Sequence, residues 1–160
     1  RGQGAAVRIE PKARAGIFLV AAGFFVTNVH SPRVWSQPLE PWRAASGLVF
    51  GLAAIALAWA AVGNLGRQWR IDAGLNADHE LIQTGAYRIV RHPIYLSILL
   101  ILLMTIAFAG TLPGWPIGIA LAIMGTEIRV RVEDRLLLDR FGDPFAEWRK
   151  RVPAYLPFIR

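Results

Sequence analysis

The feature that most constrains the fold is a series of apolar runs, each nearly or wholly free of charged residues. Residues 44–63 and 94–112 hold no charge and match the length of a membrane-spanning helix, which needs roughly 20 apolar residues. Two shorter runs cover residues 15–29 and 115–128, the second of which includes Glu127. The sequence therefore predicts an all-α integral membrane protein with about four transmembrane helices, in a single domain over residues 1–160.

The alternative is a soluble helical bundle in which these runs form the core. The chain is 54% hydrophobic with a mean hydropathy of +0.39, which leaves few polar residues to cover such helices. Trp35, Trp42 and Trp115 stand near the ends of the apolar runs, where indole rings favour the headgroup layer of a bilayer. The composition thus favours surrounding lipid over surrounding water.

The positive charges predict how the chain is oriented. The net charge is +7, but the basic residues alternate with apolar runs, so we expect contact with a membrane surface and not with nucleic acid. They gather before residue 15, within residues 64–93 and after residue 126, whereas residues 30–43 and 110–114 hold only Arg33 and Arg43. The positive-inside rule then predicts a multi-pass protein with both termini in the cytoplasm.

Two further features narrow the chemistry and the location. The chain has no cysteine, which excludes a disulfide, a thiol nucleophile and a cysteine-ligated metal. Residues 1–14 are too polar to be a signal peptide. These features are compatible with a bacterial inner membrane, which we take as the expected location.

The tail after the last apolar run is predicted to be helical. Apolar residues recur at helical spacing up to Phe141, and Gly142 is a typical stop signal. Asp143 as N-cap and Pro144 at the first helical position predict a short amphipathic helix, which Pro153 ends. This aromatic and basic tail either lies on the membrane surface or packs on the cytoplasmic face of the helices.

The segment Arg91-His92-Pro93 precedes the run 94–112. Proline is favoured at a helix start, so His92 is predicted to lie at the N-terminal boundary of that helix. Unpaired backbone N–H groups and the positive end of the helix dipole can hold an anionic group such as a carboxylate there. The alternative is that these residues only anchor the helix at the membrane interface.

Several motifs occur in a fixed order around that segment. The stretches "DHELIQTGAYRIVRHPIY" and "EIRVRVEDRLLLDRFGDPFAEWRKRVPAYLPFI" resemble the isoprenylcysteine carboxyl methyltransferase family. This family belongs to a wider group of integral-membrane methyltransferases that includes phospholipid N-methyltransferases. The resemblance covers residues 79–159. The family commonly has two glutamates where this chain has Glu133 and Asp134.

The resemblance implies S-adenosylmethionine as cofactor, held at the cytoplasmic side by residues 79–95 and 129–159. It implies Arg129 and Glu133 as catalytic residues, with Arg129 facing the substrate. The residues that the resemblance places around the cofactor are His79, Glu80, Leu81, Ile82, Tyr87, His92, Pro93, Ile94, Tyr95 and Glu133.

The residue types suit that cofactor, although each has a plainer alternative. Tyr87 and Tyr95 offer aromatic faces to a sulfonium or to adenine, or are interface-belt tyrosines. Glu133 can accept hydrogen bonds from the ammonium or ribose hydroxyls, or forms a salt bridge with Arg129 one helical turn earlier. His92 can hold the cofactor carboxylate, and His79 is otherwise a solvated loop residue.

The reaction would be an in-line displacement at the activated methyl group, in which alignment supplies much of the rate. A carboxylate nucleophile is already ionised and needs only Arg129 to orient it, whereas an amine or thiol needs a base such as Glu127 or His79. Three hypotheses therefore stay open. The first is carboxyl methylation of an isoprenylcysteine-like or other amphiphilic isoprenoid substrate. The second is methylation of a phospholipid amine or a thiol, and the third is a non-enzymatic small membrane protein.

Overall fold

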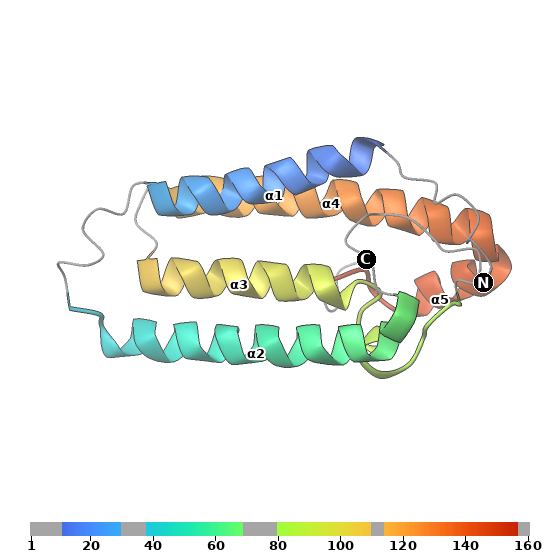
Figure 1. The fold of residues 1–160 in the computed structure, drawn as a ribbon, viewed down its shortest axis with the longest axis horizontal. Helices are drawn as coiled ribbons and strands as arrows, with labels where there is room; N and C mark the ends of the chain where they lie inside the picture. The colour runs from blue at the N-terminus through green and yellow to red at the C-terminus, as the bar shows by residue number, and fades with distance from the viewer. Residues whose placement is uncertain (1–10, 30–37, 69–79, 110–113, 157–160) are drawn as a thin grey trace.

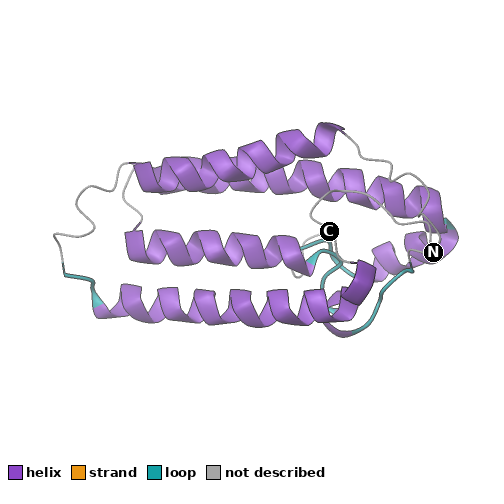
Figure 2. Cartoon of the chain, viewed as in Figure 1, coloured by secondary structure: helices purple, strands orange, loops and turns teal. Residues whose placement is uncertain are grey.

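The described part of the fold is built from four long helices and one short one. The computed structural model describes residues 11–29, 38–68, 80–109 and 114–156, and these contain helices and no strand (Figures 1 and 2). The α-helices are α1 (Pro11–Val29), α2 (Pro41–Leu65), α3 (Pro93–Ala109), α4 (Gly114–Phe141) and α5 (Asp143–Arg151). Two 3₁₀ turns, η1 (Gly66–Gln68) and η2 (Gly85–Arg88), lie between α2 and α3.

The four long helices run along the long axis of the molecule as two pairs. Helix α1 packs along α4, and α2 packs along α3, while the two pairs touch each other at far fewer places (Figure 1). The α2–α3 pair joins neighbours in the sequence, whereas the α1–α4 pair joins the first and fourth long helices. The short helix α5 folds back at the end of the bundle where α3 begins.

The predicted runs 15–29, 44–63 and 115–128 lie within α1, α2 and α4, and residues 94–109 of the run 94–112 lie within α3, which confirms the all-α prediction. Residues 110–112 of that run fall outside the described residues. Over 18 residues of α1 and over the 25 residues of α2, length and apolarity are sufficient to cross a membrane. Helix α3 is a shorter apolar helix, and α4 continues without a break from its apolar first half into a charged second half. The structure is membrane-like in these respects, and four spans with cytoplasmic termini remain a prediction.

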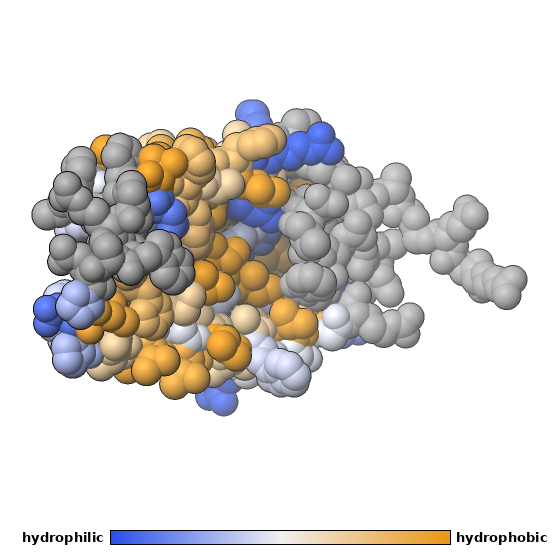
Figure 3. Space-filling model, turned by 60° about the vertical axis from the view of Figure 1, so that its left-hand side comes forward, coloured by the Kyte–Doolittle hydropathy of each residue, from blue (hydrophilic) through white to orange (hydrophobic). Residues whose placement is uncertain are grey.

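The outer surface is unusually apolar for a folded chain. Large hydrophobic side chains of α2 such as Leu48, Leu52 and Ile55 are exposed, and Trp59 is 83% exposed. Figure 3 shows hydrophobic residues covering much of the middle of one face, with hydrophilic residues recessed among them near its centre. Exposed apolar surface of this extent is typical of a protein that contacts lipid or another apolar partner.

Glycines allow α1 and α4 to approach closely. A Cβ atom at Gly125 would lie 2.5 Å from the carbonyl oxygen of Gly16, and one at Gly23 would lie 2.6 Å from that of Gly118. Small residues on facing surfaces are how helices associate in membranes, because lipid removes the hydrophobic drive for helix pairing. The α1–α4 contact is therefore backbone against backbone at these positions.

We expect Gly125→Ala to weaken the α1–α4 pair. The new methyl group would meet backbone atoms of α1, which cannot rotate away, so we expect a loss of about 1–3 kcal/mol in the free energy of unfolding. The same change at Gly63 is the control, because a Cβ atom there meets nothing within 4 Å. Unfolding in detergent measures both variants, and equal stability of the two would contradict the close approach.

The break between α4 and α5 lies at Gly142, as predicted. Its φ of +57° is a backbone conformation that favours glycine. The predicted N-cap was wrong by one residue: Gly142 is the N-cap, so Asp143 begins α5 and Pro144 is its second residue. Helix α5 ends at Arg151, just before Val152 and Pro153.

The amphipathic tail packs against the rest of the protein. Phe145 and Trp148 of α5 are buried, and so is Tyr155 beyond it. Of the two alternatives for this segment, packing on the helices therefore applies to these three side chains. Phe158 lies outside the described residues.

Candidate functional site

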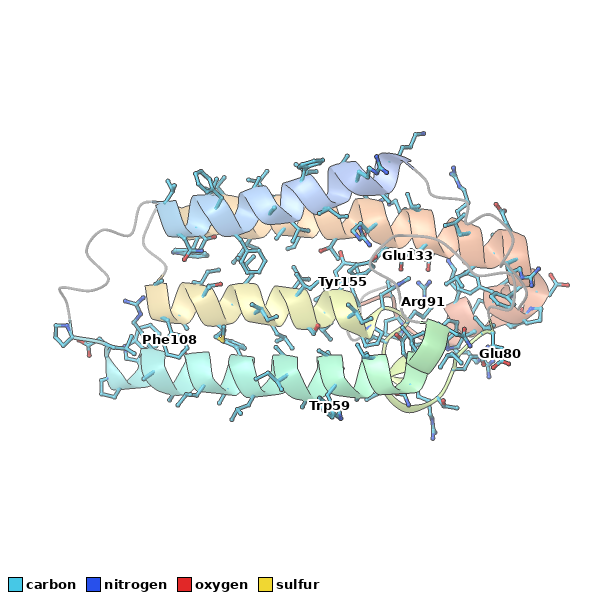
Figure 4. The ribbon with its side chains drawn as sticks, in the orientation of Figure 1. Trp59, Glu80, Arg91, Phe108, Glu133 and Tyr155 are labelled. Atoms are coloured by element: carbon cyan, nitrogen blue, oxygen red, sulfur yellow. The ribbon has the colours of Figure 1, made fainter. Side chains whose placement is uncertain are left out.

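A cluster of charged side chains lies at the end of the bundle where α3 begins. Arg91 and His92 immediately precede α3, and Glu133 and Asp134 come from the second half of α4. Figure 4 shows Arg91 and Glu133 close together at this end, while Phe108 lies at the far end of α3. The predicted helix boundary at Pro93 is confirmed, and it places both basic residues beside the acidic pair.

One oxygen of Asp134 holds both basic residues of the turn. Arg91 Nη1 lies 2.5 Å and His92 Nε2 lies 2.9 Å from Asp134 Oδ1. All three side chains are almost fully buried, with exposed fractions of 5% or less. Buried charges need such partners, because an isolated charge away from water is strongly destabilising.

Glu133 lies at the centre of the other polar contacts of the site. The hydroxyl of Tyr95 donates to Glu133 Oε1, and His92 Nδ1 lies 3.4 Å from Glu133 Oε2. Arg129 Nη2 lies 3.7 Å from Glu133, and Arg129 Nε donates to the Tyr95 oxygen at 2.8 Å. We call the resulting chain of contacts the polar network. Its members, in order of contact, are Arg129, Tyr95, Glu133, His92, Asp134 and Arg91.

Residues 152–155, which we call the strap, bind the turn that precedes α3. The backbone N–H of Arg91 donates to the Pro153 carbonyl at 2.9 Å, and that of His92 donates to the Ala154 carbonyl at 2.7 Å. The Arg91 side chain adds a bond to the Val152 carbonyl at 2.9 Å. The Tyr155 hydroxyl donates to Glu127 Oε2 at 3.2 Å. The strap therefore fixes the turn before α3 through both backbone and side chain.

Backbone N–H groups at the start of α3 are hydrogen-bonded within the protein, whereas the sequence predicted that they would be unpaired. The backbone N–H groups of Tyr95 and Leu96 donate to the His92 carbonyl, and that of His92 donates to the strap. The His92 ring faces two carboxylates of its own chain. These donors are already paired within the protein, so a role for His92 in holding the cofactor carboxylate stays a prediction.

The surroundings of His92 favour its protonated form. Burial alone would lower the pKa of His92, but hydrogen bonds to Asp134 and Glu133 and their negative charges raise the pKa above its usual value. The other groups that face this ring are Tyr95, whose ring stacks 5.7 Å away, and the Arg91 side chain, which shares Asp134. The network is thus most favourable when His92 carries a proton.

This raised pKa predicts a pH dependence of stability. The contribution of His92 is fully present below the unfolded-state pKa of about 6.5 and is lost as the pH rises through the folded-state pKa. We expect the apparent Tm in detergent to fall between pH 6 and pH 9, and the fall to be smaller in His92→Gln. Parallel curves for the two proteins would contradict the assignment to His92.

Most of the other predicted cofactor residues meet in an apolar cluster. Tyr87 is buried with Phe145 and Trp148, and the partly buried Leu81, Ile82 and Ile94 pack around them. Burial and the charge of Glu133 raise the pKa of Tyr87, so its hydroxyl is neutral. We call this group of side chains the aromatic cluster. Figure 4 shows that Glu80 lies at the same end of the bundle.

The structure bears on the plainer alternatives for the two tyrosines and for Glu133. Tyr87 and Tyr95 are both buried, which does not fit interface-belt tyrosines. Glu133 contacts Arg129 as the salt-bridge alternative requires, but it also contacts Tyr95 and His92. The side chain of His79 falls outside the described residues.

Sequence reasoning missed three contributions to the site. Asp134 was noted only as half of an acidic pair, yet it holds Arg91 and His92 together. The role of the strap was not predictable from the sequence, since its contacts to the turn before α3 are made by backbone carbonyls. Phe145 and Trp148 stood in the sequence at helical spacing, but nothing in that spacing placed them beside Tyr87.

The fold and site define a helical, membrane-like protein with a buried charged centre at one end of its bundle. The sequence profile of the isoprenylcysteine carboxyl methyltransferase (ICMT) family matches residues 47–139, which include α3, most of α2 and α4, and the entire polar network. The chain belongs to this family.

Two named relatives are similar to the chain. The cobalt-zinc-cadmium resistance protein CzcN of Cupriavidus metallidurans is 30% identical over 154 residues, which cover 90% of this chain and 63% of the relative. The protein-S-isoprenylcysteine O-methyltransferase of Schizosaccharomyces pombe is 31% identical over 84 residues, which cover 52% of this chain and 36% of the relative. The chain thus spans less than two thirds of either relative.

Proposed function

We propose that the protein is an S-adenosylmethionine-dependent methyltransferase of the membrane that methylates the carboxylate of an isoprenylcysteine-like, amphiphilic substrate. The observation that carries the proposal is the polar network, which joins Arg91-His92-Pro93 to Glu133 and Asp134. The family resemblance assigns His92, Pro93 and Glu133 of these motifs to the cofactor, and the motifs come from segments some 40 residues apart. Family membership supports the same activity.

In the described part of the chain, two buried polar atoms of the site are left without a partner that a bound cofactor could supply. Asp134 Oδ2 and Trp148 Nε1 find no hydrogen-bond partner among the described residues. One is an acceptor and the other a donor, and a bound molecule with both donors and acceptors would satisfy them. S-adenosylmethionine has an ammonium and two ribose hydroxyls as donors, and a carboxylate and adenine nitrogens as acceptors. The residues present fit this cofactor.

The cofactor, when bound, supplies a methyl group activated by a sulfonium. Glu133 is placed to accept hydrogen bonds from its ammonium or ribose hydroxyls, and Tyr95 holds Glu133 in position. Arg129 is proposed to orient the substrate carboxylate with its fork of N–H donors. Because a carboxylate is ionised at neutral pH, this role needs no base.

An amphiphilic substrate suits the surfaces of the molecule. The charged centre lies at one end of helices whose outer faces are apolar, and hydrophilic residues are recessed among hydrophobic ones on one face (Figure 3). A polar cofactor would reach the site from the cytoplasm, while an apolar chain would approach between helices from the bilayer. We propose further that the protein crosses a bacterial inner membrane several times and has both termini in the cytoplasm.

Binding of S-adenosylhomocysteine to the detergent-purified protein tests the proposal. We expect saturable calorimetric binding by the native chain, weakened about tenfold or more in His92→Ala and Glu133→Gln because each removes a group of the charged centre. Glu147→Gln is the matched control, since Glu147 is exposed and its carboxylate pairs with Lys150 of the same helix. No binding by a well-folded native chain would overturn the proposed function.

Once binding is established, the acceptor can be identified. Incubation with methyl-labelled S-adenosylmethionine and lipid extracts should transfer label to an acidic, prenylated lipid or peptide. Label that is stable to mild alkali marks an amine or a thioether, because carboxyl methyl esters hydrolyse under those conditions. Exclusively alkali-stable label would replace carboxyl methylation by the amine or thiol alternative.

A further inference from the structure

Trp148 carries a buried donor that the protein itself does not use. The side chain is only 4% exposed, and its Nε1 finds no acceptor among the described residues. An indole N–H can only donate, so it is satisfied only when an acceptor lies within hydrogen-bond distance. Native proteins rarely leave such a donor buried without a partner, and each case calls for an explanation such as a missing ligand.

The described side chains that form a hydrophobic cluster with Trp148 are apolar or aromatic. The buried ones are Ala61, Ala86, Tyr87 and Phe145, and partly buried aliphatic side chains and Phe141 pack against them. Tyr87 is the one polar member, and its neutral hydroxyl is not bonded to the indole. The acceptor therefore belongs to a group that fits an apolar, aromatic environment.

A short series of contacts connects Trp148 to the polar network. The Phe145 ring meets the Trp148 rings edge to face at 5.9 Å between centroids and an angle of 73°. The guanidinium of Arg91 lies 5.9 Å from the centroid of the same Phe145 ring. Trp148 and Arg91 thus contact the same aromatic ring, and Arg91 in turn pairs with Asp134. The polar network and the aromatic cluster therefore meet at Phe145.

We propose that Trp148 is a cofactor-contacting residue whose indole N–H donates to a ring nitrogen of the adenine. The proposal rests on the proposed function and assigns the two ends of the cofactor to the two halves of the site. The amino-acid end carries charges of both signs and suits the polar network, while the adenine is flat, neutral and rich in nitrogen acceptors. An apolar, aromatic cluster with one unpaired N–H suits the flat adenine better than it suits the charged amino-acid end.

Two replacements at position 148 test the donor. Trp148→Phe removes the N–H and part of the ring, and 3-benzothienylalanine at the same position replaces the N–H by sulfur while keeping the ring shape. We expect either to weaken calorimetric binding of S-adenosylhomocysteine about 3- to 10-fold, the loss of one hydrogen bond. Trp59→Phe is the control, because Trp59 is 83% exposed on α2, and its affinity should stay within twofold of native.

Stability of the ligand-free protein separates this role from a merely structural one. A structural hydrogen bond would be lost in the benzothienyl protein and its Tm would fall. Removal of an unsatisfied donor should leave the Tm equal or higher while the affinity falls. A folded benzothienyl protein that binds S-adenosylhomocysteine within twofold of native would overturn the proposal.

Analogues of the ligand test the same contact without any variant. In 1-deaza, 3-deaza and 7-deaza S-adenosylhomocysteine, one ring nitrogen is replaced by a carbon. We expect the native protein to bind one of them several-fold more weakly than the parent, and equal affinity for all four ligands would overturn the adenine contact. Failure of the proposed function looks different, because the native chain would then bind none of them.

Discussion

Asp134→Asn is expected to lower the free energy of unfolding by about 3–5 kcal/mol, the usual result of removing one partner of a buried ion pair. The change leaves Arg91 and protonated His92 buried without the carboxylate oxygen that both contact. An asparagine of the same size would also turn an N–H₂ or a neutral oxygen toward two cationic groups. Unfolding by SDS titration in mixed micelles, followed by circular dichroism, measures the difference.

Asp139→Asn provides the control on the same helix. Asp139 is exposed, and surface substitutions of this kind usually change stability by no more than about 0.5 kcal/mol. The two variants have the same change of charge, so a difference between them reflects the buried contacts alone. If Asp134→Asn were as stable as Asp139→Asn, Asp134 would not be what holds the turn before α3.

Arg129→Gln is expected to reduce kcat/KM for carboxyl methylation of a prenylated N-acylcysteine by about 10²–10³, the cost of removing one well-placed charged donor from a reacting anion. Arg129 is buried, stacks over the Tyr95 ring at 5.2 Å and approaches Glu133. Initial rates with methyl-labelled cofactor measure the loss. Calorimetry with S-adenosylhomocysteine shows whether the variant still binds cofactor.

Arg135→Gln is the matched control for this variant. Arg135 lies on the same helix but is exposed, so its rate should stay near the native rate. A phospholipid amine offered as substrate adds a second comparison, because a cationic acceptor gains nothing from a guanidinium beside it. A native rate of carboxyl methylation in Arg129→Gln would exclude Arg129 from orienting the acceptor.

Much of the fold could be predicted because its helices carry strong local signals. Uncharged runs gave the positions of the long helices, and Pro93 gave the start of α3. Which helices pair could not be predicted, because an apolar face does not specify its partner in lipid. The α1–α4 contact depends on glycines such as Gly16 and Gly125, which become neighbours only in three dimensions. The N-cap of α5 was missed by one residue because the backbone of Gly142 already makes the turn.

The site was predictable where motifs carried it and unpredictable where tertiary contacts did. Arg91, His92 and Glu133 were singled out from the sequence, and the structure brings them together. The bond between His92 and Asp134 joins residues 42 positions apart, and no local pattern specifies that distance. The strap binds Arg91 and His92 through carbonyl oxygens, which every residue possesses. Trp148 became notable only because its N–H is buried without an acceptor.

The strap also determines when during synthesis the site can form. Arg91 is held by Val152, which the ribosome adds 61 residues later, whereas α2 and α3 can pair as soon as both have been made. Helix α1 must likewise wait for α4, its partner in the finished fold. A nascent chain that stops growing before residue 152 therefore has its long helices but lacks the strap that holds the polar network. If the proposed function holds, interrupted translation should yield protein that does not bind S-adenosylhomocysteine.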